Sequence, residues 1–445
     1  MKTRFAPSPT GYIHVGNCRT LLVNWLFTRA HKGTFLLRLD DTDLERSEAK
    51  YETALLEDLN WLGLNYDDYF KQSDRLTRYA QVAEQLKKEG RLYACYETAQ
   101  ELEFKRKRQA AQGLPPLYDR GALHLTPAQK ESYEAEGRKP HWRFLMKDAP
   151  IEWDDMVRGP IHFEGKHLTD PVVIREDGVP LYTFASVIDD MDSEITHIIR
   201  GEDHITNTAV QIQLWEALGV PQNQITFGHL SLLQSAEGSQ LSKRLGTESI
   251  RDFRDKGILP MAVNSLLAKI GTSDPVQPFQ NLDHLLVSFD IKKFSRATPK
   301  FSTDELASLN EKIIHHMSYE DAQKQSHFPH LDPIFWEAVR PNLKSLSELP
   351  EWWQICRGNI ETSIPEDDKS FIQTAKDLLP PEWSTNPWDD WMTALKQTTD
   401  RKGKSLFMPL RQALTAQDHG PELKIILGLM GATLAHTRLA HALKK

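Results

Sequence analysis

The chain has 445 residues, of which 40% are hydrophobic and 26% charged, and its formal net charge at pH 7 is −8. It is too long for one ordinary hydrophobic core, so we expect two to four domains. No apolar stretch is long enough to span a membrane, and the N-terminus lacks the apolar segment of a secretory signal, so we expect a cytoplasmic protein with no membrane partner. The three cysteines, Cys18, Cys95 and Cys356, lie far apart, which argues against a disulfide framework and against a zinc site.

The N-terminal residues alternate between strand and helix patterns. Residues 3–6 form a short strand candidate, and the prolines and glycine of residues 7–11 predict a turn. From Gly16 onward the apolar residues have helical spacing, and Gly33 marks the end of this helix. Residues 35–39 then predict a buried strand. Together they form a βαβ unit, which implies a parallel sheet.

A second unit of the same kind follows much later in the chain. Residues 195–200 predict a strand, residues 205–218 an amphipathic helix, and residues 225–233 the next strand, followed by a loop at 234–246. Two such units with dissimilar sequence between them indicate one doubly wound α/β domain split by an insertion at 91–178. From about residue 247 the pattern is mostly helical.

Three features of the sequence each have two possible interpretations. The basic run at 105–108 is more often a solvated helix face than a binding site. Residues 401–445 hold eight Lys or Arg against two acidic residues, which fits either a local polyanion contact or a solvated helical surface. Trp388 and Trp391 lie three residues apart, which favours a helical core face over a platform for stacking on RNA bases.

Two short segments carry candidate chemistry. His14, Gly16 and Asn17 lie between the first strand and its helix, where free N–H groups and the helix dipole favour phosphate. Residues 241–244, Leu-Ser-Lys-Arg, lie in the loop after the second unit, where Lys243 would be a mobile point charge. Each segment alone is a weak signal, whereas their order on either side of a large insertion is a strong one.

The segment from Arg4 to Asn17 resembles the HIGH region of the glutamyl-tRNA synthetases, which are class I aminoacyl-tRNA synthetases, and residues 241–244 resemble their KMSKS loop. The resemblance extends over essentially the whole chain, most closely in residues 1–65 and 180–250, and includes 38–43, 180–182, 189–190, 199–204 and 409–414.

The resemblance implies a Rossmann-type catalytic domain of residues 1–90 and 179–245, split by an α/β insertion at 91–178 that binds the tRNA acceptor end. A helical junction domain at 246–318 and an all-α anticodon-binding region at 319–445 would follow. It also implies ATP with Mg²⁺, L-glutamate and tRNA as partners, and a monomer. No zinc is expected, because this sequence lacks the clustered cysteines of a zinc site. The acceptor would be tRNA(Glu), with tRNA(Gln) as an additional or alternative acceptor. The rival functions are a glutaminyl-tRNA synthetase, a small-molecule nucleotidyltransferase of the same superfamily, and a catalytically silent RNA-binding relative.

The resemblance further implies residue roles. His14 and Lys243 would be catalytic. Glutamate would be bound by Arg4, Ala6, Ser8, Asp40, Tyr182, Ser186 and Arg200. ATP would be bound by His14, Gly16, Asn17, Asp203, Leu241, Ser242, Lys243 and Arg244.

The sequence departs from the family pattern at several of these positions. Asp40 is usually glutamate, Ser186 stands where asparagine is common, and Gln240 replaces the first lysine of the loop. The insertion retains only Cys95 of the cysteines that hold zinc in many bacterial relatives, and Ala122 stands where a late cysteine would be.

Overall fold

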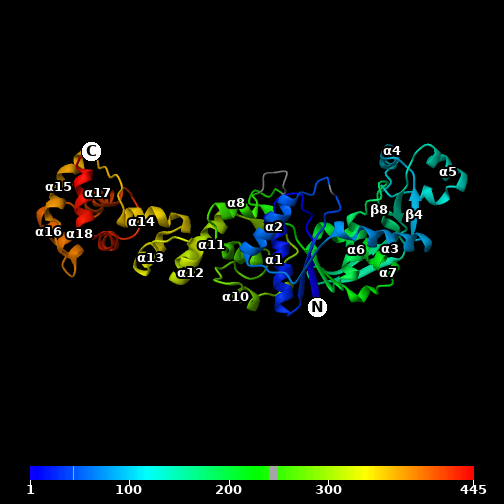
Figure 1. Ribbon diagram of the computed structural model, residues 1–445, viewed down its shortest axis with the longest axis horizontal. Coiled ribbons are helices and arrows are strands. Elements are labelled where there is room, and N and C mark those ends of the chain that lie inside the picture. The colour runs from blue at the N-terminus through cyan, green and yellow to red at the C-terminus, as the bar shows by residue number, and fades with distance from the viewer. Residues whose placement is uncertain (44, 240–247, 445) are drawn as a thin grey trace. The chain divides into compact units, whose positions relative to one another are not determined.

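The computed structural model describes residues 1–43, 45–239 and 248–444 (Figure 1), which form two compact units. The first unit comprises residues 1–256 and 263–303, and the second comprises residues 257–262 and 304–445. No helix in the described part of the chain combines the length and apolar character needed to cross a bilayer.

The first unit contains all the strands that the structure describes. They are β1 (Lys2–Phe5), β2 (Thr34–Leu39), β3 (Asp68–Lys71), β4 (Leu92–Cys95), β5 (His141–Phe144), β6 (Pro150–Asp155), β7 (Gly159–Glu164), β8 (Val172–Ile174), β9 (His197–Gly201), β10 (Thr226–Leu230), β11 (Gln234–Ser235) and β12 (Lys300–Phe301). Its helices are α1 (Val15–Ala30), α2 (Ala49–Leu62), α3 (Leu76–Lys88), α4 (Ala99–Ala111), α5 (Pro127–Ala135), α6 (Tyr182–Asp192), α7 (Ile205–Ala217), α8 (Ile250–Asp255) and α10 (Leu282–Val287), while α9 (Pro260–Lys269) spans the division between the units.

Two sheets lie edge to edge and form the doubly wound core. In the first sheet, β1, β2 and β3 are parallel, and in the second the order is β7-β6-β10-β9. The backbone N–H of Thr196 donates to the carbonyl of Lys2 at 3.0 Å, which places the start of β9 beside β1. The order across both sheets is therefore β3-β2-β1-β9-β10-β6-β7, and the two βαβ units predicted from the sequence are confirmed as neighbours.

The predicted insertion contributes to two different sheets. Its strands β4, β5 and β8 form a separate antiparallel sheet, and in Figure 1 they lie with α4 and α5. Residues 150–164 instead form an antiparallel hairpin, β6 and β7, whose strand β6 pairs with β10 of the core. The hairpin therefore extends the same sheet that carries β9 and β10.

Several predicted elements have shifted ends. The helix predicted from Gly16 begins at Val15, and the strand predicted at 225–233 ends at Leu230. Residues 231–233 leave the sheet, and Gln234 begins the short strand β11, which pairs with β12. The chain thus turns away at the carboxyl end of β10, and this turn contributes Ser231, Leu232 and Leu233 to a cavity wall.

Helix α1 is buried on nearly all sides. Eleven of its sixteen residues are buried, including Leu21, Leu22 and Leu26, because it packs between the parallel strands and the elements of the opposite layer. Burial of one large aliphatic side chain contributes about 1.5–3 kcal/mol, so α1 is a major anchor of the unit. Its N-terminus is therefore held rigidly at the carboxyl edge of the sheet.

The second unit is helical. Its helices are α11 (Thr303–His315), α12 (Tyr319–Ser326), α13 (Pro333–Val339), α14 (Leu349–Arg357), α15 (Lys369–Leu378), α16 (Pro387–Thr398), α17 (Lys404–Thr415) and α18 (Leu423–Ala442). Trp391 is fully buried and Trp388 packs edge-on against it, with ring centroids 6.2 Å apart. The predicted helical core face is thereby confirmed for Trp391. The guanidinium of the buried Arg438 donates to the carbonyls of Leu414, Gln354, Ile355 and Gly358.

Candidate active site

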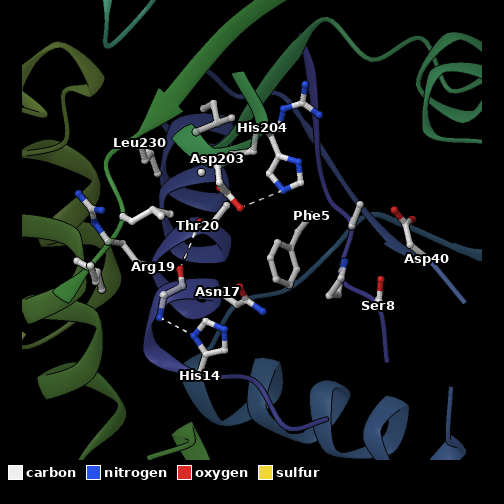
Figure 2. Close-up of a pocket in the computed structure, with 18 of the residues that line it drawn as sticks. Phe5, Ser8, His14, Asn17, Arg19, Thr20, Asp40, Asp203, His204 and Leu230 are labelled. Atoms are coloured by element: carbon white, nitrogen blue, oxygen red, sulfur yellow. Dashed lines mark hydrogen bonds and ion pairs between the residues drawn. The ribbon is translucent and has the colours of Figure 1, made fainter. Parts of the chain in front are cut away.

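A cavity of about 630 Å³ opens at the carboxyl ends of β1, β2, β9 and β10. Doubly wound sheets bind their ligands at this edge. The cavity brings together ten of the predicted site residues: Arg4, Ala6, Ser8, His14, Gly16, Asn17, Asp40, Tyr182, Arg200 and Asp203. Figure 2 shows His14 and Asn17 at the start of α1, with Ser8 and Asp40 across the cavity from Arg19. Ser186 is not among the lining residues, and the predicted residues 241–244 lie outside the described residues.

His14 caps the helix that points its N-terminus at the cavity. Its Nδ1 accepts the backbone N–H of Gly16 at 3.1 Å, so the proton of the neutral imidazole is assigned to Nε2. A Cβ on Gly16 would lie 3.1 and 3.2 Å from the imidazole atoms Cε1 and Nδ1, so glycine here lets the ring stay in place. The first turn of α1 contains no acidic residue. This end of the helix therefore offers N–H donors and partial positive charge to an anion.

A buried network of charges forms a second wall. Nε of Arg4 donates to both carboxylate oxygens of Asp190, at 3.1 and 3.3 Å. Arg38 is fully buried and donates from Nη1 to the same carboxylate at 2.7 Å. The hydrogen bonds of Arg4 to described residues come from Nε alone, and Arg4 lines the cavity. Its terminal nitrogens are therefore available to a ligand there.

Asp40 lines the cavity but is turned toward Arg38. Its two carboxylate oxygens accept from Nε and Nη2 of Arg38, at 2.6 and 3.2 Å. Burial raises the pKa of Asp40 to about 6, although the neighbouring Arg38 opposes this shift. The carboxylate is thus mostly charged at pH 7 and is already engaged by one cation.

Arg200 is buried at the end of β9 and has no carboxylate partner among the described residues. Its Nη1 donates to the hydroxyl of Tyr182 at 2.9 Å, and its Nη2 donates to Thr208 and Gln211, each at 2.6 Å. Its Nε is buried without an acceptor. Burial lowers the pKa of Arg200, and the phenol of Tyr182 opposes this shift. A buried cation held only by neutral groups is costly, and an anionic ligand would offset that cost.

Ser186 acts behind the cavity rather than in its wall. Its hydroxyl donates to the carbonyl of Tyr182 at 2.6 Å and accepts from Nε2 of Gln211 at 2.8 Å. Gln211 in turn accepts from Arg200, so Ser186 supports this guanidinium through one intermediate side chain. Sequence reasoning missed Thr208 and Gln211, although two polar residues three apart in the apolar helix α7 were a signal that could have found them.

Asp203 and His204 follow β9 at the cavity. The Nε2 of His204 lies 3.8 Å from a carboxylate oxygen of Asp203, as the dashed line in Figure 2 marks. Burial, followed by the nearby Arg200, lowers the pKa of His204 to about 4, so this ring is neutral at pH 7. A Cβ on Gly201 would lie 2.4 Å from the Asp203 carboxylate, so glycine here lets this side chain keep its position.

The geometry therefore combines a phosphate-binding helix end with a pocket for carboxylates. The α1 N-terminus, with His14, Gly16 and Asn17, can hold a polyphosphate. Arg4 and Arg200 supply guanidinium groups for the planar, bidentate binding of carboxylates. Such a site can bring a carboxylate oxygen next to a phosphate, which is the requirement for an acyl-phosphate type of transfer.

Comparison with known proteins assigns the sequence to a family. Residues 1–308 match the family model of the class I tRNA synthetases (E and Q), catalytic domain, and residues 305–443 match an anticodon binding domain. The glutamate–tRNA ligase of Azospirillum brasilense is 53% identical over 98% of both chains, and glutamate–tRNA ligase 1 of Maricaulis maris is 51% identical over 99% of both.

A solved structure has the same fold. The glutamate tRNA ligase of Elizabethkingia meningosepticum superimposes with a TM-score of 0.85 at 24% identity, covering 100% of this chain and 99% of that one. The family models span nearly the entire sequence, and relatives about half identical match it end to end. The chain therefore belongs to the glutamate–tRNA ligases, a family of class I aminoacyl-tRNA synthetases.

Proposed function

We propose that the protein joins L-glutamate to the 3′ end of tRNA(Glu), through a glutamyl adenylate made from the Mg²⁺ complex of ATP. The observation that carries this proposal is the pair Arg4 and Arg200, two guanidinium groups on one cavity beside the N-terminus of α1. Glutamate has two carboxylates, and ATP has a polyphosphate. The charges of the ligands thus match the charges of the site.

In this proposal each cation has its own carboxylate. The terminal nitrogens of Arg4 bind the side-chain carboxylate, with Tyr182 beside them, and Arg200 binds the α-carboxylate. Ala6, Ser8 and Asp40 lie around the amino group, and Ser186 supports Arg200 through Gln211. Glutamine would leave the charge of Arg4 unmatched. Loss of one side of a buried charge pair costs roughly 2–5 kcal/mol, or about 30- to several-thousand-fold in selectivity.

The first chemical step is attack of an α-carboxylate oxygen on the α-phosphorus of ATP. The new P–O bond forms as the bond to pyrophosphate breaks. His14 donates from Nε2 to the phosphate oxygens as negative charge develops, and Gly16, Asn17 and Asp203 hold the nucleotide. By the family resemblance, Lys243 is the second catalytic cation and Leu241, Ser242 and Arg244 complete the ATP loop. Catalysis of this kind depends on positioning and charge stabilisation.

The second step transfers the glutamyl group to a terminal ribose hydroxyl of tRNA, and AMP leaves. In this proposal residues 91–178 bind the acceptor end, residues 319–445 bind the anticodon, and residues 246–318 form the helical junction between the catalytic domain and the anticodon-binding region. The described residues from 304 to 444 contain no strand, which favours glutamate over the glutaminyl enzymes, whose C-terminal regions are β-barrels by the same resemblance. In this proposal the protein works as a monomer in the cytoplasm. The alternative acceptor is tRNA(Gln).

The test is aminoacylation of purified tRNA(Glu) and tRNA(Gln), each with radiolabelled glutamate and with glutamine. Charging of tRNA(Glu) with glutamate supports the proposal, and charging of tRNA(Gln) with glutamate identifies a second acceptor. Charging with glutamine would overturn the assignment of the pocket. ATP–pyrophosphate exchange without any effect of either tRNA on turnover would instead indicate a small-molecule nucleotidyltransferase.

A further inference from the structure

Three buried side chains form a continuous chain of hydrogen bonds behind Arg200. Thr208 of α7 accepts from Nη2 of Arg200 at 2.6 Å, and its hydroxyl lies 2.8 Å from Nε2 of His229 on β10. Nδ1 of His229 lies 2.5 Å from a carboxylate oxygen of Asp155 at the end of β6. Thr208 and His229 are fully buried and Asp155 is 5% exposed, so water does not substitute for these contacts.

The protons along this chain can be assigned from its ends. Burial raises the pKa of Asp155, but the hydrogen bond from His229 and the neighbouring N–H groups outweigh it, so the pKa stays below its ordinary value and the group is an acceptor only. Nδ1 of His229 therefore carries the proton. Burial lowers the pKa of His229, which leaves Nε2 as an acceptor for the Thr208 hydroxyl at 2.8 Å, and the other acceptor near this hydroxyl, the carbonyl of His204, is farther away at 3.2 Å. The oxygen of Thr208 is then oriented to accept from Arg200.

The other oxygen of Asp155 fixes the far end of the chain. It accepts the backbone N–H groups of Val157, Arg158 and His229, at 3.0, 3.0 and 3.1 Å. The carboxylate is thus bound to the turn between β6 and β7 and to β10, and cannot rotate freely. A rigid carboxylate at one end and a guanidinium at the cavity at the other fix the intervening imidazole and hydroxyl.

We infer that Asp155, His229 and Thr208 are positioning residues for glutamate, because they orient Arg200 toward the α-carboxylate of the substrate. The inference rests on the proposed function of Arg200. A guanidinium with one of its donors fixed by Thr208 loses less freedom when the substrate binds. The three residues do not touch the substrate, and the hairpin β6–β7 contributes to amino-acid binding through them.

The test uses variants that each alter one hydrogen bond in the series from Arg200 to Asp155. Thr208→Val removes the hydroxyl with little change of shape, and Thr208→Ser restores it. His229→Asn keeps a donor near Asp155 but removes the acceptor for Thr208, whereas Asp155→Asn removes the charge that fixes the tautomer. Thr28→Val is a control, because Thr28 is also a fully buried threonine in a helix, but its hydroxyl donates to the carbonyl of Asn24, at 2.6 Å, instead of to His229.

For each variant we would measure the KM for glutamate, the KM for ATP, the kcat of tRNA charging and the melting temperature. The change in the KM for glutamate is then compared with the changes in the KM for ATP and in kcat. We expect Thr208→Val to raise the KM for glutamate about tenfold or more, since a hydrogen bond to the charged Arg200 is lost, and His229→Asn to raise it to a smaller extent, since the lost hydrogen bond joins two neutral groups; both should leave the KM for ATP nearly unchanged. Thr208→Ser should recover most of the affinity, and Thr28→Val should change the melting temperature alone.

Arg200→Lys separates the inference from the proposed function. If this variant raises the KM for glutamate while Thr208→Val and His229→Asn do not, Arg200 binds the substrate and the positioning role is wrong. If Arg200→Lys leaves the KM for glutamate unchanged, the pocket assignment itself fails. If a variant of Thr208, His229 or Asp155 changes the KM for ATP as much as the KM for glutamate, it has lost structure in general, and this result would also overturn the inference.

Discussion

Arg4 and Asp190 meet through one nitrogen, with Nε of Arg4 3.1 and 3.3 Å from the two carboxylate oxygens. Asp190 is fully buried and also accepts from Arg38, so its position does not depend on Arg4 alone. The contact fixes the plane of the Arg4 guanidinium and uses none of its terminal nitrogens. A cation held in this way is preorganised for a second carboxylate, and this arrangement leads to the first prediction.

Replacing Arg4 should abolish glutamate recognition and leave the fold intact. Arg4→Ala leaves Asp190 paired with Arg38, so the loss of stability is limited, whereas the KM for glutamate should rise by at least 30-fold. Arg4→Lys keeps the charge but loses the fork geometry, and should recover only part of the affinity. The measurement is glutamate-dependent charging of tRNA together with a thermal melt.

A surface arginine provides the control for this variant. Arg78 is 41% exposed in its side chain and pairs with Asp192, and such exposed pairs contribute about 0–1 kcal/mol. Arg78→Ala should therefore charge tRNA normally. Normal glutamate charging by Arg4→Ala would mean that the pocket is misassigned.

Asp40 should give the enzyme a pH dependence near pH 6. Burial raises the pKa of this carboxyl to about 6, so its charge is present above pH 6 and is lost as the pH falls. If Asp40 attracts the substrate amino group, the KM for glutamate should rise as the pH drops from 7.5 to 5.5. Asp40→Asn should raise the KM at pH 7.5 and flatten this profile, while Asp40→Glu should keep it. A profile in Asp40→Asn that still follows the wild type would assign the titration to another group.

Asp58 of α2 should make the protein less stable as the pH rises. It is fully buried, both its carboxylate oxygens lack a hydrogen-bond donor among the described residues, and Nε of Arg251 lies 3.7 Å away. Burial raises its pKa to about 6, from about 3.9 in the unfolded chain. The folded state therefore binds this proton more tightly than the unfolded state does. Protonation of Asp58 contributes fully to the free energy of unfolding below pH 4, and this contribution is lost as the pH rises to 6. The loss is at most about 3 kcal/mol.

The corresponding variant removes this titration. Asp58→Asn should melt at a higher temperature than the wild type at pH 7.5, and the difference should shrink at pH 5. Asp67→Asn is the control with the opposite sign, because the hydrogen bonds from Arg29 and Phe35 outweigh burial and lower the pKa of Asp67. This control should be destabilised at pH 7.5. An Asp58→Asn variant that melts below the wild type at pH 7.5 would contradict the burial argument.

The core of the fold could be predicted from local sequence patterns, whereas the β6–β7 hairpin could not. Strands β1, β2, β9 and β10 are apolar runs that alternate with helices, and a parallel sheet follows from that order. Residues 150–155 alternate between exposed and buried positions, a pattern shared by any antiparallel hairpin. Their attachment to β10 depends on a contact between Asp155 and Phe227, more than seventy residues away. No local signal fixes such a pairing.

The cavity residues could be predicted by their motifs, but the direction of each side chain could not. Asp40 and Ser186 were both expected to be part of the glutamate pocket. The structure turns the Asp40 carboxylate toward Arg38, and the short Ser186 side chain bonds back to the carbonyl four residues earlier, which is a common choice for serine in a helix. The supporting residues Asp155 and His229 come from two strands that meet only in three dimensions, so a linear pattern does not reveal them.

The two roles of His14, as helix cap and as phosphate donor, can be separated by substitution. Nδ1 accepts the N–H of Gly16, and the side-chain oxygen of asparagine can replace this acceptor, whereas the donor at Nε2 is lost in His14→Asn. We expect the free energy of unfolding of this variant to lie within about 0.5 kcal/mol of the wild-type value, because asparagine is a strong cap. Its rate of ATP–pyrophosphate exchange, measured with tRNA present, should fall by roughly 10²- to 10³-fold, since one donor to the developing charge is removed.

Two further variants complete this argument. His14→Ala removes the cap as well and should cost about 0.5–2 kcal/mol of stability in addition to the lost rate. Gly16→Ala should slow exchange to a smaller extent, because the added Cβ would lie 3.1 Å from the imidazole and displace it, while the donor remains. If His14→Asn exchanges pyrophosphate at the wild-type rate, His14 serves only to cap α1, and the stabilisation of the phosphate charge must come from other groups.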